Sequence, residues 1–79
     1  MEVRVILFGH LAKLLPSASE GGEVLVQVDG EATVKRVLDQ IGVPEESRTY
    51  VTRNGVRAGM DDLVAHGDEI RVIIPLGGG

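Results

Sequence analysis

The sequence predicts an α+β fold in which a mixed β-sheet carries one main helix across one of its faces. Two observations predict this. Residues 3–8 and 69–74, at the two ends of the chain, are rich in Val and Ile and alternate as strands do. Between them, residues 33–42 place apolar side chains at helical spacing. We therefore assign residues 1–76 of the 79 to one domain and residues 77–79 to a flexible C-terminal tail.

The composition excludes several classes of protein. A net charge of −4 argues against a nucleic-acid partner, which would require clustered basic side chains. The absence of cysteine excludes disulfides, thiolate metal sites and a cysteine nucleophile. No signal peptide or membrane span is evident, so we expect a cytoplasmic protein that is a monomer when alone. Two histidines and the pair Asp61-Asp62 are too sparse for a metal or acid–base site, so we expect no bound cofactor and no enzyme acting by itself.

The first half of the chain is predicted to contain two strands joined by a short helix. In residues 3–8, alternation places Val3, Val5 and Leu7 on one face and Arg4, Ile6 and Phe8 on the other. The spacing of Leu11, Leu14 and Leu15 predicts a short helix that ends at Pro16, and residues 17–22 are a loop. Residues 23–28 then form a strand, antiparallel to the first, with one face made of Val24, Val26 and Val28.

The main helix has a clear beginning and end. Thr33 is a favourable N-cap, and Gly42 stands where a left-handed C-cap belongs, before Pro44. The apolar positions follow i, i+3, i+4, i+7 spacing: Val34, Val37, Leu38 and Ile41.

The second half is predicted to consist of short elements. Residues 49–53 form a strand that is short or at a sheet edge, because Arg53 shares a face with Val51. Asn54-Gly55 predicts a type I′ hairpin turn, residues 60–64 one helical turn, and residues 66–68 another turn. The last strand has Ile70, Val72 and Ile74 on one face and Arg71 and Ile73 on the other.

The order of these elements predicts a β-grasp, the ubiquitin-like architecture. The two terminal strands lie side by side and parallel at the centre of the sheet, because the intervening chain is long enough for the crossover. The predicted core consists of Val3, Val5, Leu7, Val26, Val37, Leu38, Ile41, Ile70 and Val72.

The whole chain resembles the MoaD/ThiS family of small sulfur-carrier proteins. The resemblance rests on residues 3–14, on the Thr33-Val34 helix start, on Asn54-Gly55, and on residues 67–70 leading to the terminal Gly78-Gly79. Two residues depart from the family pattern: Arg53 replaces a small apolar residue, and Gly77 adds a third glycine.

The resemblance implies that Gly79 carries the chemistry. An adenylyltransferase of the MoeB/ThiF type, related to ubiquitin-activating enzymes, would use ATP to adenylate its carboxylate, and a sulfur donor would convert it to a thiocarboxylate. The carrier would then give sulfur to the large subunit of a synthase. The segment that leads to the glycines, Ile74-Pro75-Leu76, resembles the molybdopterin branch of the family and favours molybdopterin-type synthesis over thiamin or other sulfur transfer. Gly77 and Gly78 would thread the tail into the partner, because glycine has no side chain to obstruct a narrow channel. The docking surface would consist of Arg4, Ile6, Phe8, Arg71, Ile73, Pro75 and Leu76.

Two other functions fit the same residues. The first is a ubiquitin-like modifier whose Gly79 is joined to lysines of target proteins. The second is a β-grasp interaction module in which the tail has no chemical role. The bland interpretation of Ile6, Phe8 and Ile73 is that they are scattered surface hydrophobic residues.

Overall fold

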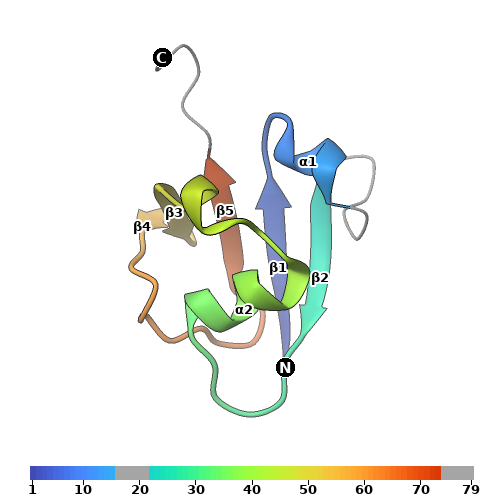
Figure 1. The fold of residues 1–79 in the computed structure, drawn as a ribbon. Coiled ribbons are helices and arrows are strands. Elements are labelled where there is room, and N and C mark those ends of the chain that lie inside the picture. The colour runs from blue at the N-terminus through green and yellow to red at the C-terminus, as the bar shows by residue number, and fades with distance from the viewer. Residues whose placement is uncertain (16–21, 74–79) are drawn as a thin grey trace.

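The computed structural model describes residues 1–15 and 22–73 of the chain. One mixed sheet has the strand order β2-β1-β5-β3-β4, and helix α2 crosses one of its faces (Figure 1). The elements are β1 (Glu2–Leu7), α1 (Leu11–Leu14), β2 (Glu23–Gln27), α2 (Val34–Ile41), the 3₁₀ turn η1 (Glu45–Ser47), β3 (Tyr50–Arg53), β4 (Val56–Arg57) and β5 (Glu69–Ile73). The predicted β-grasp is therefore confirmed.

The two terminal strands are neighbours at the centre of the sheet, as predicted. β1 and β5 are parallel, with Val5 opposite Ile70 and Leu7 opposite Val72. β2 runs antiparallel along the other side of β1, where Val3 faces Val26. This register places the apolar alternation of all three strands on the side covered by α2.

Helix α2 begins and ends where the sequence predicts. The Thr33 hydroxyl accepts a hydrogen bond from the backbone N–H of Arg36 at 3.2 Å, which is an N-cap. Gly42 takes the left-handed conformation, with φ of 85°, and its N–H bonds the carbonyls of Leu38 and Asp39. The helix buries Val34, Val37 and Leu38, but Ile41 is only half-buried, which corrects its place in the predicted core. Ile41 lies in the last turn of the helix and packs at the margin of the core.

The hairpin at Asn54-Gly55 is formed by β3 and β4. Both residues have positive φ, 53° and 86°, as a type I′ turn requires. β3 is short, as Arg53 indicated, but it is not an edge strand, because β5 flanks it on one side and the two-residue β4 on the other.

Residues 60–64 do not form the predicted helical turn. Their carbonyls instead accept the first free N–H groups of α2: Val34 donates to Asp62 at 2.9 Å and Lys35 donates to Met60 at 3.0 Å. An isolated bridge between Thr33 and Leu63 completes this contact. The segment begins with a tight turn, closed by the Asp62 N–H on the Gly59 carbonyl at 3.2 Å, and only Leu63 makes a β-bridge. In this form its carbonyls satisfy backbone donors that a helix leaves unpaired at its start.

The remaining predicted core residues are all buried, and Leu11, Val43, Val51 and Val64 join them. In the short helix α1, Leu11 and Leu15 are buried, but Leu14 is 62% exposed, because one helical turn presents only part of its surface to the sheet. Across the ranges described here, no helix has the length and apolar character needed to cross a membrane. The predicted tail, residues 77–79, lies outside the described residues, as do Ile74, Pro75 and Leu76.

Candidate functional site

The sheet face opposite α2 carries a group of apolar side chains at the end toward which β1 and β5 run. Phe8 and Tyr50 are 41% and 40% exposed, and Ile6 and Ile73 are half-buried. Tyr50 is paired directly with Ile73, and the register of β1 with β5, continued by one residue, brings Phe8 level with Ile73. We call Ile6, Phe8, Tyr50 and Ile73 the apolar patch. The structure thus brings together the three apolar residues that were predicted to share a surface.

Tyr50 is the member of the patch that the sequence analysis did not identify. It begins β3 and points to the open face, whereas its neighbour Val51 is buried. The guanidinium of Arg57, from β4, lies 4.8 Å from the centre of the Tyr50 ring, a cation–π distance. The available signal was that Tyr50 and the polar Thr52, two residues apart in a strand, share one face. The short strand, however, did not reveal which of its faces would be open.

Beside the patch, a row of alternating charges crosses the same face. Arg4 lies between two carboxylates, with Nε 3.4 Å from Glu23 and Nη1 3.9 Å from Glu69. Arg71 Nε donates to the other carboxylate oxygen of Glu69 at 2.7 Å. Arg4 and Arg71 therefore adjoin the patch, as predicted, but each already has an acidic partner on the surface. These ion pairs are exposed to solvent, so each contributes little to the stability of the fold.

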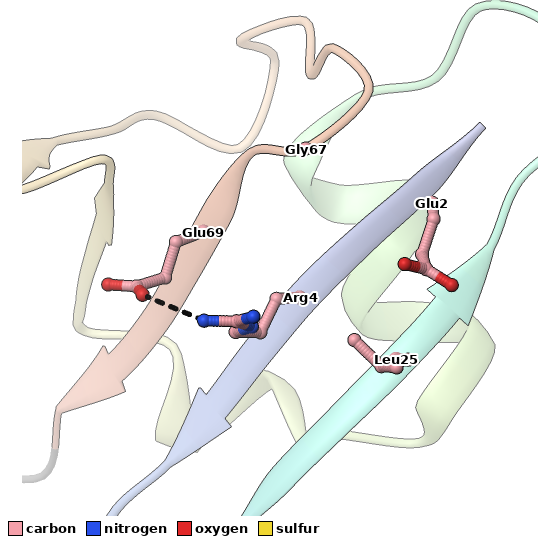
Figure 2. A pocket seen from close by; sticks show the side chains of 5 residues that line it. All are labelled: Glu2, Arg4, Leu25, Gly67 and Glu69. Atoms are coloured by element: carbon pink, nitrogen blue, oxygen red, sulfur yellow. Dashed lines mark ion pairs between the residues drawn. The ribbon is translucent and has the colours of Figure 1, made fainter.

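A shallow hollow of about 160 Å³ lies at the other end of this face. Figure 2 shows Arg4 directed toward Glu69, with Glu2 and Leu25 along the opposite rim. The hollow therefore borders the charged row rather than the apolar patch.

Two short motifs from different parts of the sequence meet at the start of β5. The side chain of Asn54 donates to Asp68 at 2.9 Å, and its oxygen accepts the N–H of Glu69 at 2.9 Å. Asp68 also accepts the N–H of Ala65 at 2.7 Å and pairs with Arg53 at 3.2 Å. The unusual Arg53 thus has a structural partner. We call this group of hydrogen bonds the Asn54–Asp68 clamp.

The clamp lowers the pKa of the Asp68 carboxyl. Burial, the largest single influence, raises that pKa by disfavouring the charged form. The hydrogen bonds from Asn54, Ala65 and Arg53, with the charge of Arg53, together outweigh burial, so that the pKa lies below its ordinary value. Asp68 is therefore an ionised structural residue that holds the β3–β4 hairpin to the start of β5.

Neither histidine is a member of the apolar patch. His66 Nδ1 accepts the backbone N–H of Glu2 at 3.0 Å, and His10 precedes α1 on the surface. Among residues 1–15 and 22–73, no three His, Asp or Glu side chains gather as metal ligands would.

The predicted reacting residue, Gly79, lies outside the described residues, together with Gly77, Gly78, Pro75 and Leu76. The described chain stops at Ile73, which is itself part of the apolar patch. The patch is therefore at the point where the chain continues toward the glycines.

Comparison with known proteins gives a consistent result. A family model described as Mut7-C ubiquitin matches residues 1–75. The solved structure of SAMP1 from Haloferax volcanii is similar with a TM-score of 0.72 and 27% identity, over 100% of both chains. A structure of the H. volcanii small archaeal modifier protein 1 has a TM-score of 0.64 and 26% identity, over 89% of this chain and 92% of that one. No curated protein matches this chain significantly.

Proposed function

This chain belongs to the Mut7-C ubiquitin family, and we propose that it is a sulfur carrier whose Gly79 carboxylate is activated and converted to a thiocarboxylate. The resemblance to the ubiquitin-like MoaD and ThiS proteins is confirmed by the family match and by the likeness to SAMP1. The general kind of protein is therefore a small ubiquitin-like modifier or carrier.

The proposed chemistry has three steps. The Gly79 carboxylate attacks the α-phosphorus of ATP in the activating enzyme, releasing pyrophosphate and forming an acyl-adenylate. A persulfide sulfur then attacks the acyl carbon and displaces AMP, which leaves an acyl disulfide. A second thiol attacks the donor's sulfur in that S–S bond, which forms a disulfide between thiol and donor and frees the acyl sulfur as the thiocarboxylate. ATP and its electrostatic stabilisation belong to the partner, and the carrier supplies the docking surface and the reacting group.

The observation that carries the proposal is the position of the apolar patch. Phe8, Tyr50 and Ile73 are partly exposed on the open face, where β5 leads toward the glycines. An activating enzyme that binds this patch would have the start of the tail within its reach. Interfaces concentrate their binding energy in a few aromatic or apolar anchors, and the patch offers two aromatic rings.

The test combines activation with intact mass. The mass of the protein isolated from its own cells first establishes whether Gly79 is the terminal residue. With an adenylyltransferase of the MoeB/ThiF type, ATP and a persulfide donor, we expect the gain that accompanies exchange of one oxygen for sulfur. Deleting Gly79 should abolish the gain while the circular dichroism spectrum stays unchanged. If Phe8→Ala no longer gains this mass while the control Leu14→Ala, at another exposed apolar residue, still does, the patch is the docking surface.

Joining of Gly79 to target lysines is the second candidate, favoured by the name of the similar H. volcanii modifier protein. Both functions share the adenylate, and they differ in the nucleophile that attacks it. Recovery of isopeptide-linked adducts, without any thiocarboxylate, would support the modifier. If neither product forms and Gly79 is dispensable, the chain is a β-grasp interaction module.

For the acceptor, we propose the large subunit of a molybdopterin-type synthase, acting in the cytoplasm. The sequence Ile74-Pro75-Leu76 directly before the glycines supports this assignment, because it resembles that branch of the family. Sulfur transfer from the thiocarboxylated protein to such a synthase, compared with a thiamin thiazole synthase, distinguishes the two pathways.

A further inference from the structure

We propose that the outer edge of β2, which no other strand of the described residues pairs, pairs with β2 of a second copy and forms a symmetric dimer with one continuous sheet. β2 is the terminal strand in the order of the described sheet, and only β1 is paired with it. Its sequence, residues 23–27, contains no Lys or Pro, and its one charged residue, Glu23, lies at the end of the strand. The apolar side chain at its centre, Leu25, is 54% exposed.

The hydrogen bonds to β1 show which backbone groups of β2 face outward. Met1 and Val28 exchange two bonds, of 2.7 and 2.8 Å, and Leu7 donates to Gly22 at 2.8 Å. In an antiparallel ladder, such bonded pairs alternate with pairs whose N–H and C=O groups point away from each other. The alternation gives Val24 and Val26 the inward bonds and leaves the backbone groups of Glu23, Leu25 and Gln27 facing outward.

A contact from α2 confirms this assignment at one end of the strand. The side chain of Gln40 donates to the backbone carbonyl of Gln27 at 2.7 Å, so this carbonyl does not point to β1. A carbonyl oxygen has two lone pairs, and it can accept a bond from a second strand as well.

One register uses the outward groups of both strands completely. If a two-fold axis passes between the two copies of Leu25, then Leu25 faces Leu25 and Glu23 faces Gln27 of the other copy. Each of these facing pairs exchanges two backbone hydrogen bonds. A shift in either direction leaves at least one outward residue of β2 without a partner in the other β2.

The side chains on the exposed face are complementary in this register. Gln27 Nε2 donates one of its hydrogens to Glu2 at 2.7 Å and retains the other. One carboxylate oxygen of Glu23 forms an ion pair with Arg4 Nε at 3.4 Å. Its other oxygen can accept a hydrogen bond from the Gln27 side chain of the second copy. Two exposed Leu25 side chains would meet at the centre, and cross-strand apolar pairs stabilise a sheet.

The dimer leaves the apolar patch free, because that patch lies on β1, β3 and β5 and on Phe8, which directly follows β1. Directly opposed residues point to the same side of a sheet, so both patches would be on one face and both α2 helices on the other. The proposed dimer differs from the monomer that the sequence analysis expects. Because each copy carries a net charge of −4, its affinity should rise with salt.

The test is sedimentation velocity on the full chain from micromolar concentrations to about 1 mM, where even weak association is visible. We expect the wild type to shift toward dimer as its concentration rises. Leu25→Pro removes an outward N–H but no bond to β1, as proline on an edge strand allows. Leu25→Lys keeps the N–H and adds a central charge. Both should remain monomeric, whereas Leu14→Lys, at the comparably exposed Leu14, should dimerise normally.

Charge variants at Gln27 test the register itself. Gln27→Glu sets like charges opposite Glu23 and should weaken the dimer about tenfold, and Gln27→Lys should strengthen it by a similar factor. Circular dichroism confirms that each variant is folded. A wild type that stays monomeric at every concentration overturns the proposal, as does a dimer that folded Leu25→Pro leaves intact. Equal effects of Glu and Lys at position 27 overturn the register.

Discussion

Replacing Asp68 by Ala should destabilise the fold more than any other single change of a charged residue near the open face. The Asp68 carboxylate accepts hydrogen bonds from Asn54 at 2.9 Å, from the N–H of Ala65 at 2.7 Å and from Arg53 at 3.2 Å. The Asp68 side chain is only 10% exposed, so water does not readily replace these bonds. The side-chain oxygen of Asn54 also accepts the N–H of Glu69. If Asn54 loses its bond to Asp68, this second hydrogen bond is weakened as well.

The expected loss follows from these contacts. A hydrogen bond to a charged group contributes about 1.5–3 kcal/mol. The bond from Arg53 counts for less, because that side chain is 38% exposed and screened by water. We therefore expect Asp68→Ala to lower the free energy of unfolding by about 3 kcal/mol. Proteins of this length have a total of only about 4–12 kcal/mol.

Urea unfolding followed by circular dichroism measures this loss. The matched control is Asp61→Ala, because Asp61 is an exposed carboxylate. The control should change the free energy of unfolding by about 0.5 kcal/mol or less. If Asp68→Ala also loses less than about 1 kcal/mol, the clamp does not stabilise the hairpin and the reasoning is wrong.

Three further predictions concern stability. Folding lowers the pKa of Asp68, so the stability that ionised Asp68 contributes is complete above its unfolded-state pKa of about 3.9 and is lost as the pH falls through its folded-state pKa. When unfolding is measured over acid pH, the free energy of unfolding should therefore fall less in Asp68→Ala than in wild type. Gly22→Ala should cost about 2 kcal/mol or more, because a Cβ there would collide with the Leu7 carbonyl oxygen at a φ of 76°; Gly30→Ala, with positive φ but open space, should cost less in the same urea assay. Leu38→Ala should cost about 2–5 kcal/mol by calorimetry, because Leu38 is fully buried, and a loss below about 1 kcal/mol would contradict the packing of α2 on the sheet.

Features that depend only on neighbours along the chain could be predicted before the structure was known. Alternation in residues 3–8 and 69–74 identified the central strands and their buried faces. Thr33 and Gly42 marked the ends of α2, and Asn54-Gly55 marked the hairpin. Each of these signals works within a few residues, because a cap or a tight turn is a local backbone requirement.

The contacts between residues far apart in the chain became clear only from the fold. Tyr50 joined the apolar patch because the antiparallel register sets it opposite Ile73. Residues 60–64 did not form a helical turn, and their carbonyls instead accept unpaired N–H groups at the start of α2. Asn54 and Asp68 were each weak motifs until strand pairing placed their side chains 2.9 Å apart. The physical reason is that strand register fixes these contacts, and register results from the packing of the whole sheet against its helix rather than from the periodicity of any one segment.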